Sequence, residues 1–177
     1  MKRWIFLIPL IVFAFHGLLM AEGASSRFRA ELLGEIDDVG KKLVELAEAV
    51  PEEKYAWRPA EGVRSVSEVY MHVAAGNFYV LKLAGIEPGA GLPADPEKSV
   101  TKKPEVIESL KKSLEHISQA LSKATDADLD EPADFFGQKT TARGIFLRLD
   151  QHMHEHLGQS IAYARINGIV PPWSRNQ

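Results

Sequence analysis

Cysteine is absent from the 177 residues of this chain. Disulfides, thiolate metal sites and cysteine nucleophiles are therefore excluded, so any metal must be held by nitrogen and oxygen ligands. A strong charge of either sign is also missing, because the formal net charge is −3 and there is neither a basic run nor an acidic tail. This balance gives no indication of a nucleic-acid partner. Strand-like alternation of apolar and polar residues is scarce, which favours an all-α protein.

A long apolar run is present at the amino terminus, where two basic residues precede an apolar stretch over residues 4–15 and Ala21 follows. This order is typical of an export signal, and we predict that residues 1–21 are a signal peptide cleaved after Ala21, with Ala24 as the alternative. The other interpretation is an uncleaved anchor over residues 4–20, since about 20 apolar residues span a bilayer. We therefore expect a periplasmic or extracellular protein. It would be anchored to a membrane only if the amino-terminal segment is not cleaved.

The remaining residues, 25–177, predict one domain built from helices. Apolar residues recur three and four positions apart in four segments, which is the pattern of amphipathic helices. The predicted limits are a first helix ending at Pro51, a second from the capping box Ser65–Glu68 to Gly85, a third from Pro104 to Ala124, and a last from Thr140 or Thr141 to Gly168. Four such helices without strands predict an all-α four-helix bundle.

Two connections are longer than most loops of a compact domain. Residues 86–103 are rich in proline and glycine, and such a length can cross one end of a bundle. Residues 126–139 are polar, and we interpret their acidic side chains as turn and capping residues. Phe135 and Phe136 are expected to tuck over the end of the bundle.

Three of the six histidines lie within five residues of the last helix. His152 and His156 are four positions apart and share one helix face, whereas His154 points elsewhere. An i,i+4 histidine pair is the simplest bidentate metal site that a helix offers. Both residues fall on the predicted inward stripe, where an imidazole without a partner costs about 1–3 kcal/mol. A shared divalent cation would satisfy both rings at once.

His72 is the remaining candidate for a third ligand, because it borders the predicted core of the second helix. Three imidazoles with an open position would resemble catalytic zinc, where bound water ionises near neutral pH. The alternative is three histidines at the edge of the core that bond to carbonyls and to one another. His116 is interpreted as a surface or boundary residue.

Weaker roles are considered for four polar or small neighbours on the last helix. Gln159 could hydrogen-bond the second nitrogen of a ligating histidine. Glu155 and Asp150 could be general bases, although solvent-facing ion pairs are the simpler interpretation. Gly158 is expected to let another helix approach closely. No residue is assigned a catalytic role from the sequence.

The sequence resembles the DinB family of metalloenzymes over about residues 26–173. The motifs that carry the resemblance are Trp57-Arg58-Pro59…Gly62…Ser65-Val66…His72, then His152-x-x-x-His156-x-Gly158-Gln159 and Tyr163…Gly168…Pro171-Pro172. The resemblance implies a four-helix bundle with up-down-down-up connections, including a long crossover between the second and third helices. It also implies that His72, His152 and His156 together bind a divalent metal ion, with zinc or nickel the most common.

The resemblance further implies a metal-dependent hydrolase or transferase that activates water or a thiol and acts on an unidentified small molecule. Relatives include thiol-S-transferases that use bacillithiol or mycothiol, and an isomerase that depends on such a thiol. Many members of the family are homodimers. Glu155 stands where many members have a histidine, and export would separate the chain from cytoplasmic thiols. No thiol-binding residue is therefore carried over. The alternative is a non-catalytic exported module whose structural metal has a fourth ligand such as Glu155 or Glu68.

Overall fold

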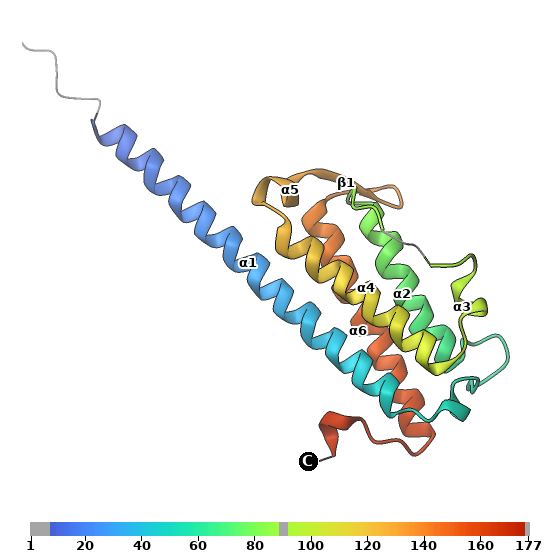
Figure 1. Cartoon of the computed structure of the whole chain (residues 1–177). Coiled ribbons are helices and arrows are strands. Elements are labelled where there is room, and N and C mark those ends of the chain that lie inside the picture. Colours follow the sequence, from blue (N-terminus) through green and yellow to red (C-terminus); the bar gives the residue numbers. More distant parts are fainter. Residues whose placement is uncertain (1–7, 89–91, 176–177) are drawn as a thin grey trace, which may run out of the picture.

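Four long helices make up most of the computed structural model, which describes residues 8–88 and 92–175, with side chains from Arg27 onward. They are α1 (Ile8–Ala49), α2 (Val66–Lys82), α4 (Lys103–Lys123) and α6 (Ala142–Ile166) (Figure 1). The short elements are η1 (Glu52–Lys54), α3 (Pro96–Ser99), α5 (Asp126–Asp130), β1 (Pro132–Phe135), β2 (Gln138–Thr141) and η2 (Pro172–Ser174). The all-α class expected from the sequence is confirmed.

Local sequence signals set the ends of the helices that carry the candidate site. The Ser65 hydroxyl accepts from the Glu68 amide, and the Glu68 carboxylate accepts from the Ser65 amide, so α2 begins with a complete capping box. Thr141 caps α6 by accepting from the Gly144 amide. α2 ends at Lys82 and α6 at Ile166, each close to its predicted glycine stop.

The four long helices form a closed arrangement in which α1 and α2 each pack against both α4 and α6. Lys103 Nζ donates to the Val50 carbonyl, which brings the start of α4 to the end of α1. The Tyr163 hydroxyl donates to the Arg64 carbonyl, which brings the end of α6 to the start of α2. α1 and α6 therefore run in one direction, and α2 and α4 run in the other (Figure 1).

The connection between α2 and α4 returns along the bundle, because these neighbouring helices run in the same direction. It begins after Lys82 and must reach Lys103 at the other end of α2. On the way it forms α3, which packs against α2. A long crossover was expected from the sequence. It also brings an acidic residue, Glu97, to His72 in the first half of α2, which was not expected.

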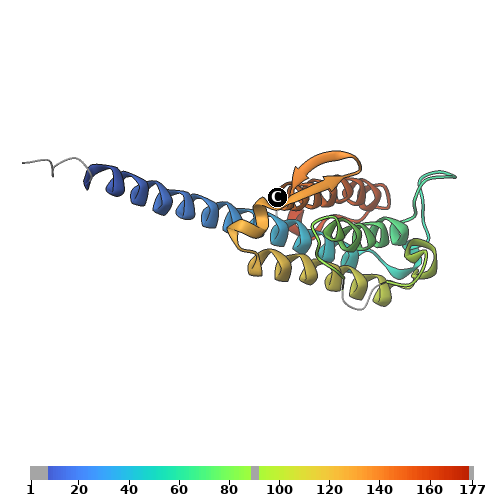
Figure 2. The same ribbon diagram turned by 90° about the horizontal axis from the view of Figure 1, so that it is seen from above.

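A β-hairpin between α5 and α6 contradicts the expectation of a fold without strands. β1 and β2 are antiparallel with Phe135 opposite Gln138, so Phe136 and Gly137 alone form the turn. Their φ angles are 52° and 88°, as a two-residue hairpin turn with positive φ at both central positions requires. Figure 2 shows the hairpin lying against α6. Asn-Gly is the usual sequence signal for this turn. Because the turn here is Phe-Gly, the sequence did not predict the hairpin.

Phe136 was expected to tuck over the end of the bundle, and its side chain lies on the outside of the helices and is 68% exposed. Its ring stacks on Tyr79 of α2, with centroids 6.0 Å apart. Phe135 is half-buried and meets Phe136 edge to face. The hairpin thus covers part of the bundle through one phenylalanine and leaves the other at the surface.

The predicted inward stripe of α6 consists of Ile145, Leu149, His152, His156, Gln159 and Tyr163, and it is displaced by one residue between Leu149 and Tyr163. Met153, Leu157 and Ser160 are buried, whereas His152 and His156 are half-buried at the border between α6 and α2. The histidines therefore lie at the edge of the core and not within it. A polar pair at this border meets both the neighbouring helix and the surface.

The amino-terminal prediction remains untested. Residues 1–7 of the expected signal peptide lie outside the described part, and its remaining residues, from Ile8, form the helical backbone at the start of α1. Among the described residues, no helix combines the length and the apolar composition needed to cross a membrane.

Candidate metal centre

Three histidines from two antiparallel helices converge at the border of α2 and α6. One nitrogen from each of His72, His152 and His156 lies within 4.8 Å of the corresponding atom of the others. The Nε2 atoms of His72 and His152 are 3.2 Å apart. The ring centroids lie 4.6 to 5.0 Å apart, and each pair of rings meets edge to face. The arrangement that the sequence predicted for these three residues is therefore present.

Gly76 creates the space that His152 occupies against α2. A Cβ atom at position 76 would lie 2.7 Å from His152 Cε1, which is closer than two carbon atoms tolerate, and 3.3 Å from His152 Nδ1, which is a tight contact. A close approach was predicted at Gly158 instead, and that prediction is wrong. Gly158 is exposed, and a Cβ atom there would have no packing neighbour within 4 Å among the described residues. Close packing at this site depends on the glycine of α2.

We expect Gly76→Ala to displace the His152 ring and to weaken divalent-metal affinity by at least about tenfold, as changes beside metal ligands commonly do. The matched control is Gly158→Ala, which should leave affinity unchanged and raise helix stability by about 0.5–1 kcal/mol. Isothermal titration with Zn²⁺ measures the first effect, and urea unfolding measures the second. Equal affinities in the two variants would contradict this role of Gly76.

The outer nitrogen of His72 is held by a carboxylate. Glu97 Oε1 lies 2.7 Å from His72 Nδ1, and Glu97 Oε2 lies 2.7 Å from Arg64 Nε. Burial raises the pKa of Glu97, but hydrogen bonds from Arg64 and His72 outweigh this effect and lower the pKa below its ordinary value. Because an ionised carboxylate can only accept, Nδ1 of His72 carries the proton. The lone pair of His72 Nε2 is then free to face the other two histidines.

His156 is oriented by a second hydrogen-bond chain. The Tyr163 hydroxyl donates to the Arg64 carbonyl, and Gln159 Nε2 donates to the Tyr163 oxygen over 2.9 Å. The Gln159 carbonyl oxygen is left as the acceptor 2.9 Å from His156 Nδ1. His156 therefore carries its proton on Nδ1 and directs the Nε2 lone pair at the site, as ligating histidines usually do. The role predicted for Gln159 matches this contact.

This donor set fits a divalent cation. Metal–imidazole bonds of about 2.0–2.1 Å place two neighbouring ligand nitrogens roughly 3 Å apart, close to the 3.2 Å between His72 Nε2 and His152 Nε2. Among the described residues, His152 Nδ1 is buried without a hydrogen-bond partner. The polar contact of His152 is thus made through Nε2, on the side of the other two rings. Three nitrogen donors on one point suit zinc, nickel and related ions.

The surroundings of the cluster disfavour protonated imidazole. Burial, together with the neighbouring His156, His72 and Arg64, lowers the pKa of His152 from 6.5 to about 4. Burial also lowers the pKa of His156, although its hydrogen bond to Gln159 acts in the opposite direction. Neutral imidazoles near pH 7 are the form that binds metal.

The metal-free protein should lose stability as the pH falls from about 6.5 towards 4. The unfolded chain binds a proton at His152 near pH 6.5, whereas the folded protein binds it only near pH 4, so the unfolded state holds more protons in this window. The stabilising contribution is complete above the unfolded pKa. Melting temperatures with a chelator should fall more steeply between pH 7 and pH 5 for the wild type than for His152→Ala. Parallel curves would contradict the assigned pKa.

The other residues considered from the sequence lie outside the cluster. His154 is exposed, and its Nδ1 lies 3.0 Å from the Asp150 carbonyl oxygen and 3.4 Å from Asp150 Oδ1. Glu155 is exposed. Glu68 is bonded within the capping box and to Arg58. Sequence reasoning missed Glu97 because it lies in a connection without periodicity, and a lone acidic residue there gives no signal.

A polar cleft adjoins the cluster through the residues that hold its outer nitrogens. Its volume is about 570 Å³, which is in the range of small-molecule sites. Its lining contains three basic and three acidic side chains: Arg58, Arg64 and Lys98, with Glu68, Asp95 and Glu97, beside Gly62, Val63 and Gln159. The cleft near the histidine cluster is therefore lined by charged side chains, with equal numbers of positive and negative charges.

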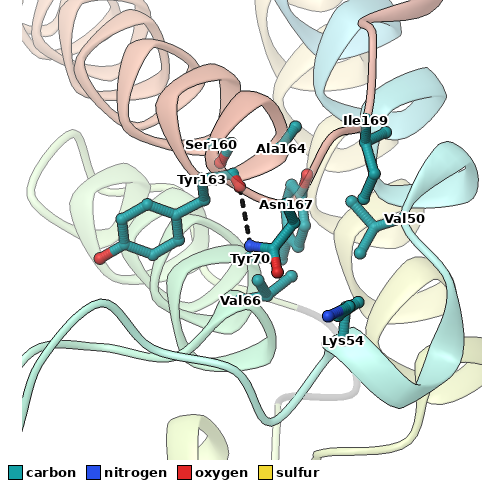
Figure 3. A pocket seen from close by; sticks show the side chains of 9 residues that line it. All are labelled: Val50, Lys54, Val66, Tyr70, Ser160, Tyr163, Ala164, Asn167 and Ile169. Carbon is teal, nitrogen blue, oxygen red and sulfur yellow. Dashed lines mark hydrogen bonds between the residues drawn. The ribbon is translucent and has the colours of Figure 1, made fainter.

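An enclosed cavity near the end of α6 is too small for a substrate. Figure 3 shows its lining, including the Asn167 amide that donates to the Tyr163 carbonyl over 2.9 Å. Its volume is about 10 Å³, which is room for about one water molecule. The cleft beside Glu97 and Gln159 is therefore the better candidate for a substrate site.

Comparison with known families decides where the chain belongs. The model of the DinB superfamily matches residues 35–160, which is more than half of the sequence and includes all three histidines. The chain belongs to the DinB superfamily. The resemblance read from the motifs is therefore confirmed.

Solved DinB structures share the fold of this chain. A DinB-like protein from Bacillus cereus matches with a TM-score of 0.69 and 21% identity, over 80% of this chain and 93% of that one. A DinB-like protein from Bacillus subtilis matches with a TM-score of 0.63 and 22% identity, over 79% of this chain and 93% of that one. No curated protein matches. The likeness to these DinB structures supports the architecture, and the chemistry must be argued from the site.

Proposed function

We propose that this DinB superfamily member is a metal-dependent enzyme. In this proposal His72, His152 and His156 bind one divalent cation, zinc or nickel, and the reaction is a hydrolysis or a group transfer on a small molecule. The bound cation would act as a Lewis acid that lowers the pKa of a water molecule or a thiol.

The observation that carries the proposal is the number of ligands. Among the described residues the cluster has three possible ligands and no fourth. Catalytic zinc sites have three protein ligands and an open position, whereas structural sites are closed by four. The two residues that would have closed a structural site, Glu155 and Glu68, are exposed or bonded elsewhere.

The remaining groups of the site support binding and orientation. The outer nitrogens of His72 and His156 lie within hydrogen-bond distance of Glu97 and Gln159. The cleft beside them offers a substrate the guanidinium groups of Arg58 and Arg64 and several carboxylates. A small polar molecule bound there would lie beside Glu97 and Gln159, the residues that hold the outer nitrogens of His72 and His156.

Cobalt substitution tests whether the site is open. Co²⁺ bound by three imidazoles with an exchangeable position should change its visible spectrum when azide or a small thiol is added, because these replace the exchangeable ligand. A site closed by four protein ligands should not respond. One equivalent of Co²⁺ with a saturable response supports the enzyme. One equivalent without a response overturns it in favour of a structural metal site.

We also propose that the protein is exported through its amino-terminal segment. The support is the order of two basic residues, an apolar run and Ala21 within residues 1–21. Amino-terminal sequencing of the protein recovered from a periplasmic or secreted fraction should begin at residue 22 or residue 25. A chain recovered from the membrane with its first residues intact would instead support an anchor.

A further inference from the structure

Glu97 reaches the candidate site because of the chain topology. α2 and α4 are parallel neighbours, so the segment between them must return along α2, and α3 packs on α2 during that return. Its first turn places Glu97 beside His72, although the two residues are 25 positions apart. Neither the capping box nor the histidine motifs specify this contact.

Two partners fix the Glu97 carboxylate. Oε2 accepts from Arg64 Nε at 2.7 Å, and Arg64 Nη2 lies 3.4 Å from Oε1. Arg64 directly precedes Ser65, the cap of α2, so the guanidinium is attached to the same helix that carries His72. The carboxylate is therefore held against α2 from two sides, with Oε1 directed at His72 Nδ1.

We infer that Glu97 is the positioning residue for His72, which it holds in the Nδ1–H form with Nε2 directed at the metal site. This inference rests on the proposed metal function. The two nitrogens of an imidazole point away from each other, so a carboxylate bonded to Nδ1 lies on the far side of the ring from Nε2. Glu97 therefore acts through His72 and is not a fourth ligand. Such carboxylate–histidine pairs orient the ring and raise its basicity.

The protonated nitrogen of His72 can be measured without any metal. Long-range ¹⁵N–¹H spectra of the metal-free protein should show His72 as the Nδ1–H tautomer in the wild type. In Glu97→Ala the resonances should move towards the Nε2–H form that free histidine prefers. Glu97→Gln keeps an oxygen acceptor and should retain the Nδ1–H form. The Nε2–H form in the wild type, or unchanged spectra in Glu97→Ala, would overturn the inference.

Metal affinity provides the second readout. Glu97→Ala should weaken Zn²⁺ binding by about 10–100-fold and Glu97→Gln by less, since loss of such a partner commonly has this effect. The matched control is Glu105→Gln, which removes one negative charge from the first turn of α4, where Glu105 pairs with Lys102. The control should bind Zn²⁺ like the wild type. Equal affinities in Glu97→Ala and the control would overturn the inference.

The Co²⁺ spectrum separates a positioning residue from a ligand. If Glu97 acts through His72, Co²⁺ bound to Glu97→Ala at saturating concentration should keep the coordination number and the azide response of the wild type. A changed coordination number would make Glu97 a ligand and overturn the inference. Failure of the proposed function is a different result, because it appears as absent metal or absent azide response in the wild type itself.

Discussion

A variant carrying both His152→Ala and His156→Ala is expected to lose its stoichiometric metal and to keep its helical fold. Structural zinc sites bind with about 10–16 kcal/mol shared among four ligands, so losing two ligands costs on the order of 5 kcal/mol, or more than a thousandfold in affinity. Elemental analysis of the purified protein measures the metal, and far-ultraviolet circular dichroism measures the helices. Both rings are half-buried at the helix border, so their removal leaves the apolar core intact.

His154→Ala is the matched control for this experiment, because it removes an exposed histidine from the same helix. It should retain one equivalent of metal. His72→Ala, on the other helix, should lose metal as the α6 variants do, since all three nitrogens meet at one point. Metal retained by His72→Ala at wild-type affinity would limit the site to the pair on α6, and negligible metal in the wild type would remove the site altogether.

The sequence predicted the three histidines because two independent regularities coincide. The four-residue spacing of His152 and His156 places both rings on one side of a helix whatever its surroundings. The position of His72 beside the apolar stripe of its own helix places it at a helix border. When four amphipathic helices pack together, polar residues at the edges of two apolar stripes come together at the border between their helices.

The exact core line of α6 could not be predicted from the same pattern. Neighbouring residues on a helix differ by about 100°, so stripes that begin at His152 and at Met153 overlap over most of their width. The spacing of apolar residues fixes the period but leaves the rotation of the helix uncertain by about one residue. Packing against α2 and α1 decides it, and it turns Met153 inward.

Contacts made by irregular segments were also beyond the sequence. Glu97 is placed by the return of the chain along α2, which depends on the parallel arrangement of α2 and α4. The hairpin depends on a Phe-Gly turn, in which a bulky residue adopts a φ of 52°. Neither the Glu97 contact nor the hairpin has a periodic signal in the sequence.

Met153→Ala is expected to destabilise the metal-free protein strongly, whereas His152→Ala is not. Met153 is fully buried, and its sulfur lies 3.9 Å from the Asn77 amide nitrogen of α2. Truncating a buried methionine to alanine costs about 2–5 kcal/mol, because transfer energy is lost and a cavity remains. For a domain of this size that lowers the melting temperature by roughly 5–15 °C. Urea unfolding with a chelator present measures the difference in free energy.

The contrast between these adjacent residues is the test of the displaced stripe. His152→Ala removes a half-buried ring that makes one hydrogen bond within the described residues, from Nε2 to His72, so we expect a loss of about 0.5–1.5 kcal/mol. In a metal-binding experiment the more damaging substitution should be the other one: His152→Ala should not bind the metal, whereas Met153→Ala should bind it. If His152→Ala were the more destabilising in the metal-free state, the histidines would belong to the core after all. The face of α6 that stabilises the fold and the face that binds the metal would then be the same. The displaced stripe instead separates them, with Met153 on the face that packs in the core and His152 at the border with α2.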